Sequence, residues 1–120
     1  MRLLQKKAIA QKRRWRIRRK VVGTDERLRL AIKFTEKHIY AQCINDSDGK
    51  TKLYSSTNMK VLRSNAWKPN LEGASQFGTD FGEKLSNAGI EQVVLDRAGR
   101  HYHGTVKAFA DAVRKKGIRF

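Results

Sequence analysis

The 120-residue sequence contains only one cysteine, Cys43, and one proline, Pro69. A single cysteine excludes an intramolecular disulfide and a cysteine-rich zinc site. No stretch approaches the ~18–20 consecutive apolar residues of a membrane helix, and residues 1–22 lack the apolar segment of a secretory signal peptide. We therefore expect a small soluble protein of a reducing compartment.

Acidic residues are scarce, above all near the N-terminus. The chain has 27 Lys and Arg against 11 Asp and Glu, a net charge of +16, and residues 1–20 hold ten of the basic residues and no acidic one. Like charges at this density repel one another, so this segment is not expected to settle on a domain by itself. We predict a basic arm over residues 1–22 and one globular α/β domain over residues 23–120.

The arm is best explained by a nucleic-acid partner. Trp15 lies between Arg14 and Arg16, so an indole ring can stack on a base while its neighbours hold phosphates. A solvated tail is one alternative. A mitochondrial transit peptide is usually rich in serine, which residues 1–22 lack, and a membrane-surface helix needs a less ragged apolar face. The sequence does not determine whether the arm is helical before it binds.

Three segments after the arm are predicted as strands. Residues 28–34 alternate apolar and polar side chains with the period of two that is typical of a half-buried strand. A short turn of Glu36 and Lys37 joins them to a second strand over residues 38–45, as an antiparallel hairpin. A third, weaker strand is predicted over residues 51–58.

A helix is expected over about residues 71–88, with Asn70 as its cap and Gly89 as its stop. Its inward positions follow a spacing of three to four residues and are Ala74, Phe77, Phe81, Leu85 and Ala88. Its three glycines indicate either close packing against the sheet or a loose first part of the helix; they are Gly73, Gly78 and Gly82.

The helix leads to a fourth strand over residues 90–95, which must lie parallel to an earlier strand because the helix forms a crossover. A second helix begins at Thr105 and has Lys115 and Lys116 in its last turn. Residues 118–120 are a possible short edge strand. Residues 59–70 give no clear pattern. The predicted order is βββαβα, with an optional last strand, behind the arm.

Catalysis is a weak hypothesis for this sequence. A metal-dependent nuclease needs converging carboxylates, but the first strand has none, and Asp96 is expected to cap its loop or to pair with Arg97. His101 and His103 have the spacing of a metal pair but no evident third ligand. We therefore predict no enzyme activity, no metal and no cofactor, with the nuclease as the alternative.

The segment 96–104 (DRAGRHYHG) is better explained by RNA. It offers two arginines for phosphates or base edges, a tyrosine for stacking and histidines for hydrogen bonds. The alternative is a self-capping turn with Tyr102 in the core. RNA is favoured over DNA because the second helix carries mainly Ala, Val and Phe and lacks the side chains of a major-groove recognition helix.

Two stretches resemble a known family: residues 23–45 (GTDERLRLAIKFTEKHIYAQCIN) and, more closely, residues 96–120 (DRAGRHYHGTVKAFADAVRKKGIRF). They resemble the bacterial-type L18 family of large-subunit ribosomal proteins, which bind 5S ribosomal RNA. The resemblance implies a mixed sheet of ribonuclease-H-like topology with strand 4 beside strand 1. It also implies a structural role without catalysis, in which the protein helps to attach 5S RNA to the main large-subunit RNA in the central protuberance.

The predicted partners are 5S rRNA, the main large-subunit rRNA and neighbouring 5S-binding ribosomal proteins, with no membrane and no small-molecule substrate. A nonspecific nucleic-acid chaperone is the alternative function. The expected location is the cytoplasmic ribosome of a bacterium, with an organellar ribosome left open. The candidate RNA-binding residues are Arg13, Arg14, Trp15, Arg16, Arg18, Arg19, Lys20, Arg27, Arg29, Lys37, His38, Tyr40, Gln42, Arg97, Arg100, Tyr102, His103 and Lys107.

Overall fold

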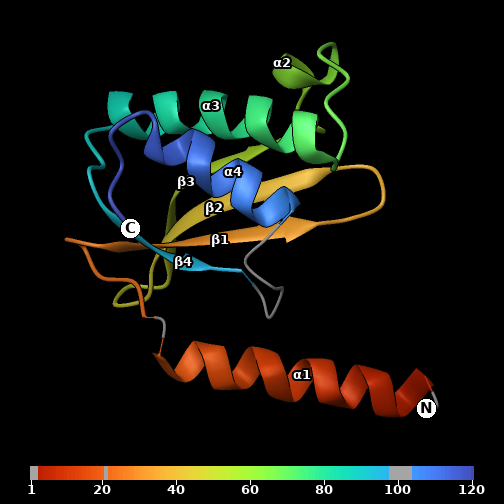
Figure 1. The fold of residues 1–120 in the computed structure, drawn as a ribbon. Helices are drawn as coiled ribbons and strands as arrows, with labels where there is room; N and C mark the ends of the chain where they lie inside the picture. The colour runs from red at the N-terminus through yellow and green to blue at the C-terminus, as the bar shows by residue number, and fades with distance from the viewer. Residues whose placement is uncertain (1–2, 21, 98–103) are drawn as a thin grey trace.

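A computed structural model describes residues 3–20, 22–97 and 104–120 of the chain (Figure 1). Its strands are β1 (Leu28–Phe34), β2 (Ile39–Asn45), β3 (Lys50–Ser56) and β4 (Val93–Asp96), and its helices are α1 (Leu3–Lys20), α2 (Lys60–Arg63), α3 (Leu71–Asn87) and α4 (Thr105–Arg114). The strands form one sheet in the order β3-β2-β1-β4. β2 is antiparallel to both of its neighbours, and β4 is parallel to β1. The predicted mixed α/β sheet of ribonuclease-H-like topology, with strand 4 beside strand 1, is confirmed.

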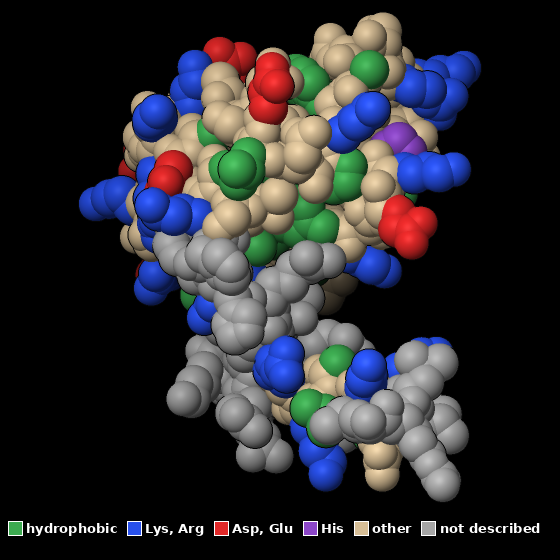
Figure 2. All heavy atoms as spheres, turned by 45° about the vertical axis from the view of Figure 1, so that its right-hand side comes forward, with side chains coloured by type: hydrophobic (Ala, Val, Ile, Leu, Met, Phe, Trp, Pro, Cys, Tyr) green, Lys and Arg blue, Asp and Glu red, His purple; other side chains and the backbone are tan. Residues whose placement is uncertain are grey.

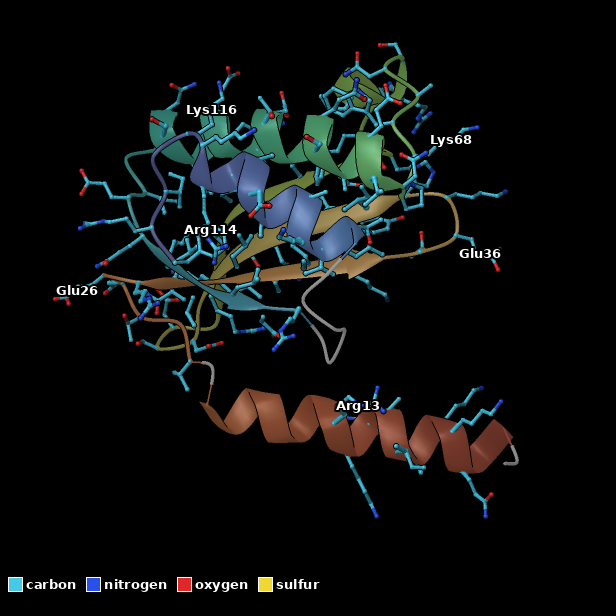
Figure 3. All side chains as sticks on the ribbon, viewed as in Figure 1. Arg13, Glu26, Glu36, Lys68, Arg114 and Lys116 are labelled. Atoms are coloured by element: carbon cyan, nitrogen blue, oxygen red, sulfur yellow. The ribbon has the colours of Figure 1, made fainter. Side chains whose placement is uncertain are left out.

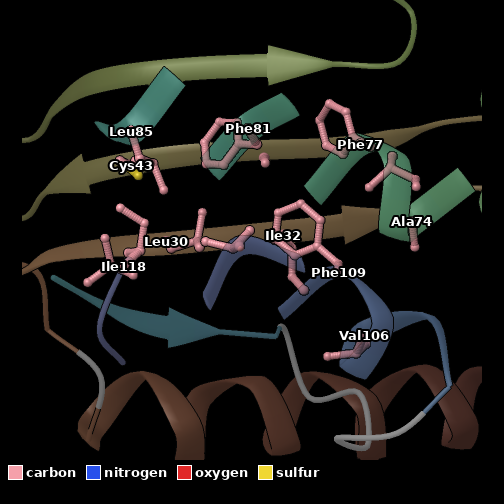
Figure 4. Close-up of a cluster of buried hydrophobic side chains, with 14 of the residues drawn as sticks. Leu30, Ile32, Cys43, Ala74, Phe77, Phe81, Leu85, Val106, Phe109 and Ile118 are labelled. Carbon is pink, nitrogen blue, oxygen red and sulfur yellow. The ribbon is translucent and has the colours of Figure 1, made fainter. Parts of the chain in front are cut away.

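The core lies between the sheet and two helices, because α3 and α4 cover the same face (Figure 1). Alternate residues of β1, such as Leu30 and Ile32, point into it and are buried. The helices contribute Phe77, Phe81 and Phe109, all fully buried, with ring centroids 5.7–6.1 Å apart (Figure 4). The period of two in β1 and the spacing of three to four in α3 therefore identified core residues correctly, with the exception of Ala88.

The fourth strand begins later than predicted. β4 covers Val93–Asp96 rather than residues 90–95. The N–H of Ile90 donates to the carbonyl oxygen of Leu85 at 2.9 Å, which closes the turn after α3 and keeps Ile90 out of the sheet. The predicted last strand is reduced to a single parallel bridge between Gln92 and Arg119.

The helix ends also differ in detail from the prediction. Asn70 caps α3 as predicted, since its side chain accepts a hydrogen bond from the N–H of Gly73 at 2.7 Å. Ala88, predicted to point inward, is exposed at the C-cap. α4 stops at Arg114, so Lys115 and Lys116 follow the helix instead of forming its last turn. The helix cannot continue past them because Gly117 adopts a φ of 89°.

The glycines of α3 mark a close approach of two helices. A Cβ atom added at Gly78 would lie 2.6 Å from the carbonyl oxygen of Phe109, so the backbone of α4 occupies the space that a side chain would need. A Cβ atom added at Gly82 would lie 3.3 Å from the Cα atom of Val113 in α4 and 2.8 Å from the side chain of Lys116, which follows α4. The expected close packing exists, but at these two positions it is against α4 rather than the sheet.

Residues 59–70, which gave no clear pattern, contain the short helix α2. Its N-cap residue, Met59, makes no side-chain hydrogen bond, and the helix is too short to show a period. The following loop returns to the core at Trp67, which packs edge-on against Phe77 with centroids 6.5 Å apart. Tertiary packing rather than local propensity therefore holds this segment.

Cys43 is a buried thiol of β2. Burial raises its pKa to about 12. In the unfolded chain the thiol ionises near its ordinary value, so folding stability is lost as the pH rises from about 9 toward 12. The loss reaches at most about 1.4 kcal/mol per pH unit. We expect iodoacetamide to leave Cys43 unmodified in the native protein at pH 8.

The matched control is Cys43→Ala, measured by denaturant unfolding over the same pH range. Tyrosine and lysine residues titrate equally in both proteins, so the stability difference between them isolates the thiol. That difference should narrow above about pH 9. Rapid alkylation in native buffer, or a difference that does not change with pH, would contradict the buried thiol.

Candidate nucleic-acid interface

The predicted basic arm forms α1, an 18-residue helix. At a rise of about 1.5 Å per residue it is about 27 Å long. The helix lies on the side of the sheet that faces away from α3 and α4 (Figure 1). The side chains of Lys6, Lys7, Lys12 and Arg13 are exposed, and Figure 3 shows Arg13 on this helix. The described part of α1 thus presents cations without a neighbouring acid.

Six further candidate residues lie in this helix, but the structure describes only their backbone and not their side chains. They are Arg14, Trp15, Arg16, Arg18, Arg19 and Lys20. In Figure 2 the helix is in the lower part of the view, where blue Lys and Arg side chains are visible. Every charged residue of this helix is basic, so the helix can neutralise the negative charges of a phosphate backbone.

The second part of the interface is the face of the sheet that α3 and α4 leave open. Lys33 of β1 stands opposite Tyr40 of β2, and Gln42 stands opposite Tyr54 of β3. Lys33, Tyr40 and Gln42 lie out of phase with the buried residues of β1 and β2, and Tyr54 shares their face through its pairing with Gln42. All four are exposed or half-buried, with Tyr54 48% exposed. A cation, two aromatic rings and an amide on one surface can hold a phosphate, stack on bases and hydrogen-bond to base edges.

The turn between β1 and β2 extends this face. Lys37 is exposed in the turn, and His38 is half-buried. The Nδ1 atom of His38 lies 3.1 Å from the Oγ1 atom of Thr57, and its ring packs edge-on against Tyr40 with centroids 6.4 Å apart. Two candidate rings are therefore held in a fixed relation at one end of the sheet.

Arg27 and Arg29, both candidate RNA contacts, have different surroundings. The Nε atom of Arg27 donates to the carbonyl oxygen of Val93 at 3.1 Å, and the residue is exposed. The Arg29 side chain is only 12% exposed and pairs with Asp46 and Asp96. Burial opposes the charge of Arg29, but hydrogen bonds and charges from both carboxylates outweigh this and raise its pKa. Arg29 therefore binds two carboxylates of the protein itself, as a residue with a structural role does.

The predicted RNA-binding loop is described only at its two ends. Asp96 is the last residue of β4, and Arg97, which follows it, is half-buried. Arg100, Tyr102 and His103 lie outside the described residues. At the far end of the loop, Lys107 is exposed on α4.

The ion pair of Asp96 bears on the nuclease alternative. Its carboxylate accepts a hydrogen bond from Nη1 of Arg29 at 2.8 Å, which gives Asp96 a structural partner that the sequence analysis did not name; the pair with Arg97 stays a prediction. Over residues 3–20, 22–97 and 104–120, no group of three or more His, Cys, Asp or Glu side chains could hold a metal ion. His101 and His103 lie outside these residues.

The sequence analysis missed two groups of residues that the fold places on the surface. Lys33 and Tyr54 belong to the open face, and the outward phase of their predicted strands was a usable signal for both. The second group is a basic cluster of Lys60, Arg63 and Lys68. It was missed because residues 59–70 gave no clear sequence pattern. All three are exposed, and Figure 3 shows Lys68 at the end of the domain where the β1–β2 turn carries Glu36.

This second cluster differs from several other lysines of the domain in its ion pairing. Within the described chain, none of its three residues forms an ion pair, whereas Lys52, Lys84 and Lys116 each pair with an acid. The Nη2 atom of Arg63 donates to the carbonyl oxygen of Asn58 at 3.1 Å, which holds its guanidinium near the surface. α2 lies on the helix-covered side of the sheet, opposite α1 (Figure 1).

None of the helices in the described part of the chain combines the length and apolar character that crossing a membrane requires.

Comparison with known proteins identifies the family. The family model for ribosomal L18 of archaea, bacteria, mitochondria and chloroplasts matches residues 4–120. The large ribosomal subunit protein uL18 of Petrotoga mobilis is 43% identical over 120 residues, covering 98% of this chain and 97% of its own. That of Pseudothermotoga lettingae is 46% identical over 110 residues, covering 91% and 90%. The chain therefore belongs to the L18 family and is a structural, non-enzymatic component of the large subunit of the cytoplasmic ribosome, as these bacterial relatives indicate.

Proposed function

We propose that this chain binds 5S rRNA and helps to attach it to the main large-subunit rRNA in the central protuberance, beside other 5S-binding proteins. Residues 1–22 act as the RNA-binding arm and residues 23–120 as the RNA-binding domain. The observation that carries the proposal is the presence of cationic surfaces on both sides of one sheet. Binding works by charge neutralisation, stacking and shape, without a reaction.

We assign 5S rRNA to the arm and the open face together. The arm supplies cations for phosphates, which give affinity without sequence preference. The open face supplies the rings of Tyr40 and Tyr54, which can stack on unpaired bases of a folded RNA. The two lie on the same side of the sheet, so one RNA can reach both (Figure 1).

We assign the second RNA to the cluster of Lys60, Arg63 and Lys68. This cluster lies across the sheet from the arm, so an RNA helix held by α1 does not also cover α2 (Figure 1). Its cations lack carboxylate partners in the described chain and are available to phosphates. Two cationic surfaces on opposite sides support a protein that joins two RNA segments.

The proposal is tested by competition between RNAs in a filter-binding assay at ~0.15 M salt, where purely electrostatic binding shows no preference. The labelled RNA is a 5S transcript, and the competitor is an unrelated folded RNA of equal length. We expect the 5S transcript to be retained in the presence of excess competitor. Equal competition by both RNAs would instead identify a nonspecific chaperone.

Tyr54 offers a test of the open face. Tyr54→Ala should weaken 5S binding by about 5- to 150-fold, because stacking of one base on an aromatic ring contributes about 1–3 kcal/mol. Tyr54→Phe keeps the ring and should bind nearly as tightly as the unchanged protein. The melting temperature should change little, since the side chain is half exposed. Equal affinity of the Ala and Phe variants would remove Tyr54 from the interface.

A further inference from the structure

We propose that Arg29 is a positioning residue, which fixes the root of the basic arm relative to the end of β4. The inference rests on the proposed function, because the arm and the segment after β4 carry most of the candidate RNA contacts. In this proposal Arg29 acts through the arm and β4, instead of contacting RNA directly as the sequence analysis predicted.

The guanidinium of Arg29 joins two carboxylates that come from distant parts of the chain. Its Nε and Nη2 atoms donate to Asp46 at 3.1 and 3.2 Å, and its Nη1 atom donates to Asp96 at 2.8 Å. The side chains of Arg29, Asp46 and Asp96 are 12%, 18% and 9% exposed. Only a planar group with several fixed donors can engage both carboxylates in this way, so lysine is a poor substitute.

Asp46 carries the connection to the arm. Its Oδ2 atom accepts a hydrogen bond from the N–H of Gly23 at 2.6 Å, and its own N–H donates to the carbonyl oxygen of Gly23 at 3.0 Å. Gly23 is buried, and a Cβ atom there would lie 2.6 Å from the backbone nitrogen of Arg29. The point at which the chain leaves the domain toward α1 is therefore fastened to the carboxylate that Arg29 holds.

Asp96 carries the connection to the other segment. It is the last residue of β4, in register with Ala31 of β1, and residues 97–104 continue from it. Arg29 lies on β1 between the two attachment points. One side chain thus ties together the starts of two segments that are far apart in sequence.

The test is a double-mutant cycle on the full-length chain, with Kd for a 5S transcript measured at ~0.05 M salt, where arm binding is strongest. One variant is Arg29→Lys, which keeps the charge. This variant is made in two backgrounds, one with the natural arm and one with a neutral arm, in which all ten Lys and Arg residues of 1–20 are replaced by Gln. Arg119→Lys is the matched control, because it makes the same chemical change at an exposed residue outside this network.

We expect Arg29→Lys to weaken binding about 10-fold with the natural arm and less than about twofold with the neutral arm, a coupling typical of groups that act as a unit. Arg119→Lys should have no effect in either background. A direct contact, or a general structural role, predicts the same loss with both arms, and that result would overturn the inference. No loss with the natural arm would overturn it as well.

A second variant guards against misfolding. If Arg29→Lys does not reach a native melting transition, Asp46→Ala takes its place, because it removes the carboxylate that joins Gly23 to Arg29 and leaves the pair of Arg29 and Asp96. The same dependence on the arm is expected. Failure of the proposed function and failure of this inference give different results. If the unmodified chain does not prefer the 5S transcript over an unrelated RNA, the proposed function is contradicted. If the variant loses the same affinity with the natural and the neutral arm, the role of Arg29 is contradicted.

Discussion

Removal of residues 1–20 is expected to weaken 5S binding by about 100-fold or more at ~0.1 M salt while the domain stays folded. The arm carries ten cations and no acid. If it neutralises about six phosphates, it accounts for a slope of roughly −4 to −5 in a plot of log K against log salt. The measurement is a filter-binding titration over several salt concentrations, in which the truncated chain should show a much flatter slope.

Folding of the truncated chain is the first control for this result. The core supports it because the buried core residues in the described part of the chain come from the sheet, α2, α3, α4 and the C-terminal segment. The melting temperature should stay within a few degrees of the full-length value. A chain with the arm residues in permuted order provides a second control, since it keeps the charge and removes specific contacts. A salt slope that is unchanged by truncation would contradict the arm as the main phosphate-binding element.

Phe109→Ala is expected to cost about 3–5 kcal/mol of the free energy of unfolding, the usual range for a buried phenylalanine. The ring is fully buried against Phe77 and Phe81, with centroids 5.7 and 6.1 Å away. α3 and α4 cannot move together to fill the space, because their backbones already meet at Gly78. The melting temperature should fall by about 12 °C or more.

Lys107→Ala is the matched control for this variant. Lys107 is exposed on the same helix, and its replacement should change stability by no more than about 0.5 kcal/mol. Both variants are measured by urea unfolding monitored with circular dichroism. A loss below about 1 kcal/mol for Phe109→Ala would show that the three rings do not form the centre of the core.

Most of the fold could be predicted from local pattern. The period of two in residues 28–34 matches β1, and the spacing of Phe77, Phe81 and Leu85 matches the buried side of α3. These patterns work because each residue's burial follows from its phase within its own element. Residues 59–70 could not be read because α2 is a single turn, too short for a period.

The candidate site was predictable only in part. Charge composition identified the arm, and the family resemblance supplied Tyr40 and Gln42, which the structure places at half-buried positions of β2. The role of Arg29 was not predictable, because its partners lie 17 and 67 residues away and only strand register brings them together. A charged residue in a strand has the same appearance in sequence whether it faces RNA or a buried carboxylate.

The sequence by itself favoured one class of partner, since ten cations and no acid in the first twenty residues point to a polyanion. Periodicity also indicated the order of the four strands and of the two long helices that follow the arm. Only the tertiary structure decided which cations are free and which are occupied. The reason is that ion pairing depends on distances between distant segments, and these are fixed by sheet register and helix packing rather than by neighbours in the chain.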